Sequence, residues 1–224
     1  MSNWQEFIEK IKPIVIKQNE SIAKLYTEID KIENLIRVVT EARIHKIPFF
    51  ILGTGSFSKI PDGGIDGLVI KNNCRRFDLL GMKGKIIEQQ VGIDRKVVYA
   101  ESGTIFNQLT RFTIEEGLRG LEYQLGLPGT VGGAIYTNAR YTPKNVYAND
   151  SVEKIRIINE QNEIQEVDSD YFISRSFTEF SPAKDVILSV VFQLYPYDKK
   201  ILWERGNEAV AYRTALDNKK FAYV

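Results

Sequence analysis

The chain has 224 residues, of which 43% are apolar and 26% are charged, a balance that allows a sizeable apolar core. Its 30 basic and 29 acidic side chains leave a formal net charge of +1, which argues against a nucleic-acid-binding surface, because such a surface needs a basic excess. No apolar run approaches the roughly 18 residues of a membrane helix, which argues against a membrane protein.

The first elements that the sequence predicts are a helix over residues 30–46 and a strand over 49–52. Apolar side chains recur at helical spacing through the first segment, and Asp30 and Glu33 predict a capping box at its start. Pro48 ends the helix, and the four apolar residues after it are too few for another helix. We therefore expect a helix that leads directly into a buried strand.

Glycine-containing segments predict the loops and turns of the next part of the chain. These segments are GTGSF at 53–57, PDGG at 61–64, GMKGK at 81–85 and GIDRK at 92–96. A strand is expected at 67–71, and several short strands, separated by the last two turns, are expected across 77–103.

A second helix is predicted over residues 104–117, with Thr104 as its N-cap and Gly117 at its end. Three further elements follow it. They are a hairpin over 151–170, a strand over 185–195 and a helix from Ile201 onward. Helices and strands thus succeed one another without a repeat or a linker, so we predict an α+β fold with mixed connectivity.

Two loops concentrate glycine and hydroxyl residues. The tetrad GTGS at 53–56 is not a P-loop, because no Gly-Lys-Ser/Thr follows, and it lacks the third glycine of a dinucleotide fingerprint. In GLPGTVGG, at 126–133, Pro128 fixes one backbone angle, and Gly132 and Gly133 leave the next turn without side chains. Such loops direct several backbone N–H groups one way, which suits phosphate oxygens. A tight turn between strands is the alternative for the first loop.

Three segments, in one order, carry a family resemblance. They are PFFILGTGSFSKIPDGGIDGLVI, VYAESGTIFNQL and GLRGLEYQLGLPGTVGGAIYTNA. Together they resemble the UDP-N-acetylmuramate dehydrogenase family, also called UDP-N-acetylenolpyruvoylglucosamine reductases, over roughly residues 19–195. The resemblance implies a two-subdomain FAD-binding fold of the vanillyl-alcohol-oxidase (PCMH) type, truncated at the C-terminus. The implied parts are a small α/β subdomain with an N-terminal helical segment (1–72), a second α+β subdomain (73–198) and a helical tail (199–224).

The resemblance also implies that both glycine loops wrap one FAD. The predicted FAD-binding residues are Gly53, Thr54, Gly55, Ser56, Phe57, Ser102, Gly103, Gly120, Glu122, Gly126, Pro128, Gly129, Thr130, Val131, Gly132, Gly133, Asn138 and Ala139. In the family, the amides of a Gly-Gly-Gly-Ser-Asn loop take the pyrophosphate, and here Phe57 replaces the asparagine. Arg140 stands where the family has a glycine, so it either crowds the flavin or adds a charge beside it. Neutral amides and hydroxyls would hold the diphosphate without a cationic site.

The implied activity is an oxidoreductase of cell-wall (peptidoglycan) precursor synthesis. In the family, NADPH reduces the flavin, which then reduces an enolpyruvyl-UDP-sugar, so the resemblance implies FAD, NADPH as hydride donor and a nucleotide-sugar substrate. The family's Tyr-Arg-x-Ser arginine corresponds to a position in YFISRSFTEF (171–180), where Arg175 is the predicted catalytic residue, with a surface arginine as the alternative. The family's proton-donating serine, in Gly-Ser-Val-Phe-Lys, and its late glutamate have no counterpart in this sequence.

Arg140 and a second departure from the family, at the N-terminus, keep other functions open. The segment NESIAKLYTEID, at 19–30, runs almost directly into the first helix, so we expect the family's N-terminal strand to be deleted. The alternatives are a non-catalytic FAD-binding or regulatory protein that retains the fold, and an oxidoreductase that acts on another small sugar or alcohol. A missing strand and substrate domain would expose apolar surface, which predicts a homo-oligomer or a partner chain that supplies the missing domain.

The remaining candidate groups favour no second site. The N-terminus carries no secretory signal and Cys74 is the single cysteine, so we expect a cytoplasmic protein without disulfides. We expect an ordinary unreactive thiol at Cys74, and a pKa lowered by the neighbouring Arg75 and Arg76 is the alternative. His45, the only histidine, fits a surface position at a helix end, and the carboxylates show no metal-ligand spacing.

Overall fold

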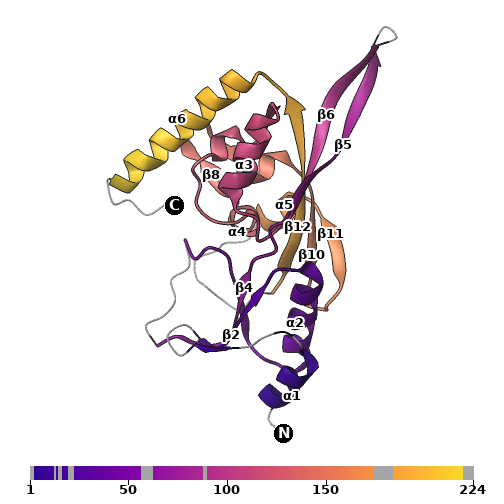
Figure 1. The fold of residues 1–224 in the computed structure, drawn as a ribbon, viewed down its shortest axis with the longest axis vertical. Helices are drawn as coiled ribbons and strands as arrows, with labels where there is room; N and C mark the ends of the chain where they lie inside the picture. The colour runs from indigo at the N-terminus through magenta and orange to yellow at the C-terminus, as the bar shows by residue number, and fades with distance from the viewer. Residues whose placement is uncertain are drawn as a thin grey trace.

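The structure is a computed structural model with two sheets, and helices pack against each (Figure 1). The first sheet and its helices form the lower part of the molecule in this view, and the second sheet forms the upper part. The described residues are 3–12, 14, 17–19, 23–56, 63–87, 90–173 and 184–218.

The first sheet has four strands in the order β1-β2-β4-β3. They are β1 (Lys17–Asn19), β2 (Ala23–Ile29), β3 (Phe49–Leu52) and β4 (Ile65–Asn72). Strand β4 runs parallel to both β2 and β3, and its last residues, Lys71 and Asn72, pair with Leu52 and Ile29. The carboxyl ends of the three parallel strands therefore meet at one edge of the sheet. In open sheets with parallel strands, ligands bind outside this edge.

Strand β2 was not predicted from the sequence, and the deletion of the family's N-terminal strand stays a prediction. Residues 23–29 form a strand of the first sheet, although its sequence leads almost directly into a helix. The buried side chains alternate along it: Ala23, Leu25, Thr27 and Ile29 point inward. This alternation is the period of a strand with one buried face. The strands at 49–52 and 67–71 are confirmed as β3 and as part of β4.

Two helices cover the first sheet, α1 (Asn3–Lys10) and α2 (Ile32–Ile44). Helix α1 lies in the N-terminal helical segment that the family resemblance implies, and α2 confirms the helix predicted over 30–46. The predicted capping box is wrong, because Lys31 is the N-cap and no side chain caps the helix. Helical spacing places the apolar side chains of α2 on one buried face: Ile32, Leu35, Val38, Val39 and Ala42.

The second sheet has its strands in the order β11-β10-β12-β6-β5, and β7 pairs with β12. They are β5 (Phe77–Ile87), β6 (Gln90–Glu101), β7 (Leu118–Arg119), β10 (Val152–Ile158), β11 (Ile164–Val167) and β12 (Val186–Pro196). All their pairings are antiparallel. The hairpin predicted over 151–170 is confirmed as β10 and β11, and the strand predicted over 185–195 is confirmed as β12.

Strands β5 and β6 correct the prediction of several short strands. They form one long hairpin that projects from the body of the molecule (Figure 1), and both predicted turns lie inside its strands. In the first predicted turn, Gly81 and Gly84 lie at shifts in the pairing register of this hairpin. Glycine inside a strand marks such irregularities as well as turns, which explains the error.

Helices α3 (Phe106–Glu115) and α6 (Lys199–Asn218) confirm the two other predicted helices. The N-cap of α3 is Ile105, because the hydroxyl of Thr104 donates to the carbonyl of Arg76 at 3.3 Å instead. Gly117 follows α3 with a φ of +67°, as expected for a glycine that ends a helix. The shorter elements are η1 (Glu122–Gln124), α4 (Val131–Tyr136), β8 (Arg140–Tyr141), η2 (Thr142–Lys144), β9 (Val146–Tyr147), η3 (Ala148–Ser151) and α5 (Asp170–Ile173).

The two sheets share part of their apolar core. Strand β4 ends at Asn72 and β5 begins at Phe77, so the chain passes from one sheet to the other in four residues. Ile158, Val186 and Leu188 of the second sheet belong to the same apolar cluster as α2 and the first sheet. Among the described residues, no helix is both long and apolar enough to cross a membrane.

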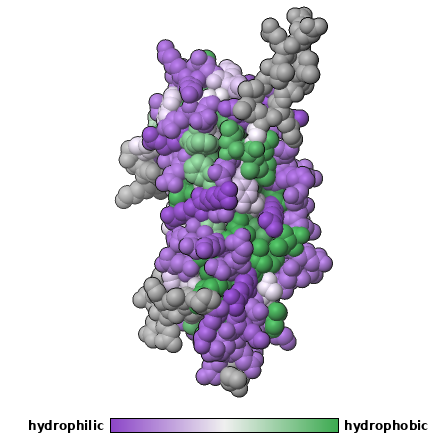
Figure 2. Space-filling view, turned by 45° about the vertical axis from the view of Figure 1, so that its right-hand side comes forward, coloured by the Kyte–Doolittle hydropathy of each residue, from purple (hydrophilic) through white to green (hydrophobic). Residues whose placement is uncertain are grey.

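Apolar side chains also reach the surface. Figure 2 shows them gathered along the middle of one face, between hydrophilic margins. The large apolar side chains that are exposed are Ile44, Leu80, Ile164 and Ile201. The expected homo-oligomer or partner chain stays a prediction.

Candidate functional site

Three loops meet beside the edge where the parallel strands end. They are residues 53–56 after β3, residues 102–104 after β6, and residues 129–133, which enter α4. A methyl group added to Gly53 would lie 2.8 Å from Thr130 Oγ1. One added to Gly132 would lie 2.9 Å from the Cβ atom of Ser102. The structure therefore brings together loops that the sequence separates by up to 80 residues.

Backbone hydrogen bonds fix the second loop against the third. The amide of Gly132 donates to the carbonyl of Ser102 at 2.8 Å, and the amide of Val131 donates to that of Thr104 at 2.8 Å. The hydroxyl of Thr130 accepts from the amide of Gly133 at 3.3 Å and so caps α4. The predicted site residues Ser102, Thr130 and Gly132 thus form one connected unit.

Several glycines are needed because one backbone packs against another. A methyl group on Gly103 would lie 2.7 Å from the carbonyl oxygens of Asn72 and Cys74, just as one on Gly132 would contact Ser102. Gly129 differs, because no atom of the other described residues lies within 4 Å of its methyl position and its φ is +116°. Glycine at this site therefore has two roles. Gly103 and Gly132 let the loops pack closely, and Gly129 leaves its backbone open to a ligand.

Asn72 joins the two sheets below these loops, and the sequence analysis did not identify it. Its side chain is 4% exposed, and its amide nitrogen donates to Ser102 Oγ at 2.8 Å. Its amide oxygen accepts from the backbone of Cys74 at 3.0 Å. Its position could have indicated this role, because Asn72 is a polar residue at the end of an otherwise apolar strand. A side-chain amide that is buried there needs hydrogen-bond partners nearby.

The loops present hydrogen-bond donors that the described part of the protein does not use. The backbone amides of six loop residues donate to no acceptor among the described residues: Thr54, Gly55, Ser56, Gly103, Gly129 and Thr130. The hydroxyls of Thr54 and Ser56 lie 2.7 Å apart beside these amides. Clustered amides of this kind bind anions, and a diphosphate offers several acceptor oxygens. The loops therefore fit the diphosphate of FAD.

A buried acceptor lies further along the same segment. Asn138 follows α4 with a φ of +46°, and its Oδ1 atom is buried with no hydrogen-bond partner in the described structure. The neighbouring Ala139 is half-buried, and its amide donates to the carbonyl of Ala134 at 2.8 Å. Arg140 is exposed and lies over the ring of Tyr147, 5.3 Å from its centre. A buried oxygen without a donor favours a ligand that brings an N–H group.

The other predicted site residues of the glycine-rich segment lie against α6. The carboxylate of Glu122 is 6% exposed, accepts from the amide of Gly120 at 2.6 Å and pairs with Arg205 of α6 at 3.1 Å. The amide of Gly126 donates to Asn107 Oδ1 at 2.8 Å. These polar groups are held by the protein itself. A cofactor role for Gly120, Glu122 and Gly126 stays a prediction.

A second arginine of α6, Arg213, also binds residues 120–126. Arg213 is 5% exposed and donates to the carbonyls of Leu125 at 2.8 Å and Tyr123 at 3.0 Å. Its guanidinium also lies 5.5 Å from the ring centre of Tyr141. Phe57 and Arg175 lie outside the described residues, so their predicted roles stay predictions.

Cys74 is not a reactive thiol. Its side chain is fully buried, and burial, with smaller effects from Glu101 and other carboxylates, raises its pKa to about 12. The expected unreactive thiol is therefore confirmed, and the alternative of a pKa lowered by Arg75 and Arg76 is wrong, since removal of the thiolate from water outweighs their charges.

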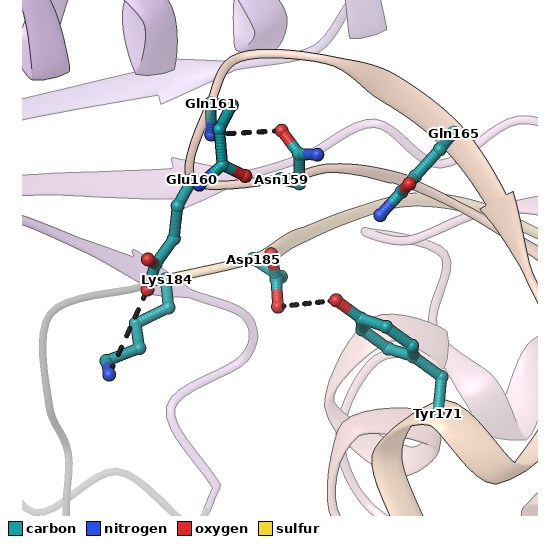
Figure 3. A pocket seen from close by; sticks show the side chains of 7 residues that line it. All are labelled: Asn159, Glu160, Gln161, Gln165, Tyr171, Lys184 and Asp185. Carbon is teal, nitrogen blue, oxygen red and sulfur yellow. Dashed lines mark hydrogen bonds and ion pairs between the residues drawn. The ribbon is translucent and has the colours of Figure 1, made fainter.

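A polar pocket of about 460 Å³ lies elsewhere, at the turn between β10 and β11 and the start of β12 (Figure 3). Its lining residues are Asn159, Glu160, Gln161, Gln165, Tyr171, Lys184 and Asp185. The hydroxyl of Tyr171 donates to Asp185 at 3.1 Å, and Asn159 accepts from the backbone of Gln161 at 3.0 Å. Much of its polar lining is thus bound within the protein, unlike the amides of the glycine loops.

Comparisons with known proteins agree with this geometry. The family described as "FAD binding domain" matches residues 23–168. The UDP-N-acetylenolpyruvoylglucosamine reductase of Listeria innocua serovar 6a is 29% identical over 214 residues, which cover 90% of this chain and 67% of that protein. The reductase of the same name from Clostridium perfringens is 33% identical over 107 residues, 48% of this chain and 31% of that protein.

Solved structures confirm the predicted fold type. UDP-N-acetylenolpyruvylglucosamine reductase from Thermus caldophilus has a TM-score of 0.63 at 21% identity, over 85% of this chain. p-Cresol methylhydroxylase with bound substrate has a TM-score of 0.56 at 10% identity, over 87% of this chain. The chain spans 62% and 44% of the lengths of these two structures, so it corresponds to part of each.

Proposed function

The chain belongs to the FAD binding domain family and is related to the UDP-N-acetylenolpyruvoylglucosamine reductases, and on this premise we propose that its three converging loops bind the diphosphate of FAD. The observation that carries the proposal is the set of backbone amides without acceptors at residues 54–56, 103 and 129–130. These donors come from loops that follow strands of both sheets and from the segment that enters α4. Neutral amides bind a diphosphate through direct hydrogen bonds at fixed positions.

The residues of the chain divide the work of binding. Loop 53–56 and Gly103 offer amides to the phosphate oxygens, and the hydroxyl pair of Thr54 and Ser56, in which one hydroxyl donates to the other, leaves one further donor. Asn138 offers its buried Oδ1 to an N–H group of the ligand. The hydrogen bonds between Ser102, Thr104 and the third loop hold these groups in place before binding, which lowers the entropy lost on binding.

The activity that we propose is that of a flavin oxidoreductase acting on an enolpyruvyl-UDP-sugar, with NADPH as hydride donor. Its support is the relationship to reductases named for such a sugar. FAD, when bound, supplies the capacity to accept and pass on a hydride. The chain spans about two thirds of the Listeria relative, so the remaining parts of a complete site are proposed to come from residues outside the described ones or from a partner chain.

Titration of the purified protein with FAD tests the binding proposal, followed through the absorbance and fluorescence of the flavin. We expect FAD to bind more tightly than FMN or riboflavin, because only FAD carries the diphosphate. Anaerobic NADPH should then bleach the bound flavin. Flavin that binds without bleaching would leave a FAD-binding protein without this donor, and absence of binding would overturn the proposal.

A matched pair of variants at Gly55 locates the diphosphate. The φ of Gly55 is +83°, a conformation that asparagine and aspartate tolerate better than other residues, so both variants carry the same backbone strain. Gly55→Asp adds a negative charge among the amides, whereas Gly55→Asn does not. We expect the aspartate variant to bind FAD at least about tenfold more weakly than the asparagine variant. Equal affinities would place the diphosphate elsewhere.

A further inference from the structure

The last two residues of β4 hold two different loops of the site. Neighbouring side chains of a strand point to opposite faces, so Lys71 and Asn72 diverge from one point. The ammonium of Lys71 donates to the carbonyl of Gly53, at the root of the first loop. The amide of Asn72 donates to Ser102 Oγ, in the second loop.

Lys71 brings a positive charge to a place where the described protein provides no negative one. Its side chain is half-buried, and no carboxylate of the described residues lies within 4.0 Å of its ammonium group. Other described lysines do have such partners: Lys24 pairs with Asp66 at 3.7 Å, and Lys154 with Glu166 at 2.6 Å. An ammonium group has three donors, and the carbonyl of Gly53 occupies one.

We propose that Lys71 is a cation of the FAD site that attracts and binds the diphosphate across the loop of residues 53–56. This inference rests on the function proposed above and adds a charged group to a site otherwise made of neutral amides. It also revises the sequence-based expectation that no cation takes part. Hydrogen bonds between a charged donor and a phosphate oxygen are about twice as strong as neutral ones.

The role of the charge differs from the role of the hydrogen bond to Gly53. If Lys71 only supported the loop, a neutral donor would replace it and the ligand's charge would not matter. If Lys71 acts on the diphosphate, its effect weakens as salt screens the charges, and it is absent for a flavin without phosphate. Salt dependence and ligand charge therefore separate the two roles.

The test compares wild-type protein with Lys71→Gln, Lys71→Arg and the control Lys24→Gln. Lys71→Gln keeps a donor and loses the charge, Lys71→Arg keeps the charge, and Lys24→Gln makes the same charge change on an exposed side chain paired with Asp66. We expect Lys71→Gln to weaken FAD binding by about tenfold or more at low salt. Lys71→Arg and Lys24→Gln should stay within about threefold of wild type, because one keeps the charge and the other lies away from the site.

The dependence on salt and on the ligand completes the test. The affinity of wild-type protein for FAD should fall with salt more steeply than that of Lys71→Gln, and the affinity for riboflavin should be the same in both. An unchanged FAD affinity in Lys71→Gln, or an equal loss for riboflavin, would overturn the inference and leave the proposed function intact. Wild-type protein that binds no FAD would overturn both. Thermal unfolding of the ligand-free variants checks that each is folded.

Discussion

The two halves of the glycine-rich segment, residues 120–126 and residues 129–133, both contain glycines and have different surroundings. In the first half, Glu122 and the amide of Gly126 are bound by the protein itself, and Arg213 of α6 clamps the carbonyls between them. In the second half, the amides of Gly129 and Thr130 have no acceptor in the described structure, and Gly132 packs against Ser102. Glycine density therefore marks close approach of the backbone, and the neighbours decide whether the partner is protein or ligand.

The largest expected effect on stability comes from removing the hydrogen bonds that Arg213 makes to residues 120–126. Arg213→Met keeps the aliphatic stem and removes the donors to the carbonyls of Leu125 and Tyr123. One buried and one half-buried carbonyl without partners should lower the free energy of unfolding by about 3 kcal/mol, measured by urea denaturation. FAD affinity should change far less than stability. The control Arg111→Met removes an exposed guanidinium that lies over Trp203 and should cost less than about 0.5 kcal/mol. An equal cost in both variants would refute the clamp.

A smaller effect is expected at Gly132, where the second half packs against its neighbours. The methyl group of Gly132→Ala would lie 2.9 Å from Ser102 Cβ and 3.0 Å from Ser102 O. We expect a loss of about 2 kcal/mol in the free energy of unfolding, because such overpacking forces the loops apart. FAD affinity should fall as well. If Gly132→Ala had the same urea midpoint as wild type, the loops of Gly132 and Ser102 would move apart without cost, and the prediction would be wrong.

The pH dependence of stability tests how tightly the protein packs around Cys74, whose backbone lies against Gly103. The pKa of Cys74 is raised to about 12, whereas an unfolded thiol has a pKa of about 8.5. The stabilisation from this group is therefore fully present below about pH 8.5. It is lost by about 1.4 kcal/mol per pH unit as the pH rises toward 12, because only the unfolded chain ionises there.

This loss is measurable against a variant that lacks the thiol. Urea unfolding of wild type and Cys74→Val, between about pH 8 and pH 10, should show a steeper decline for wild type. Parallel curves would mean that water reaches the thiol in the folded protein. The two proteins share all tyrosines and lysines, whose ionisation cancels in the comparison.

The smallest effect on stability is expected at Gly133, the neighbour of Gly132. Gly133 is exposed, and its methyl position makes only an ordinary contact, 3.5 Å from Thr130 Oγ1. Gly133→Ala should change the free energy of unfolding by less than about 1 kcal/mol, and in the stabilising direction, because alanine favours the helix. Thermal unfolding of the ligand-free protein measures this change. A loss as large as that of Gly132→Ala would contradict the difference between the two positions.

Much of the fold was predictable because its elements have strong local patterns. Helix α2 and the hairpin of β10 and β11 follow from apolar periodicity, and Gly117 ends α3 as expected. The errors have physical causes as well. Glycines at register shifts in β5 resembled turns, and no side chain caps α2 or α3.

The site was predictable in part, since its loops were identified from motifs and from a family resemblance. Contacts between distant segments could not be predicted from local patterns. Lys71 and Asn72 resembled the solvated end of a strand, yet they reach Gly53 and Ser102. Gly120 and Gly126 resembled the other glycines, yet they lie against Ser151 and Val210.

The divergence of Lys71 and Asn72 at the end of β4 has a consequence for folding. Their hydrogen bonds span 18 and 30 residues of sequence, and one of them crosses from the first sheet to the second. Closing a chain segment of this length costs conformational entropy before the contact stabilises it. The site is therefore assembled only when both sheets have docked, so FAD should bind the native state alone and stabilise the whole chain in proportion to its concentration.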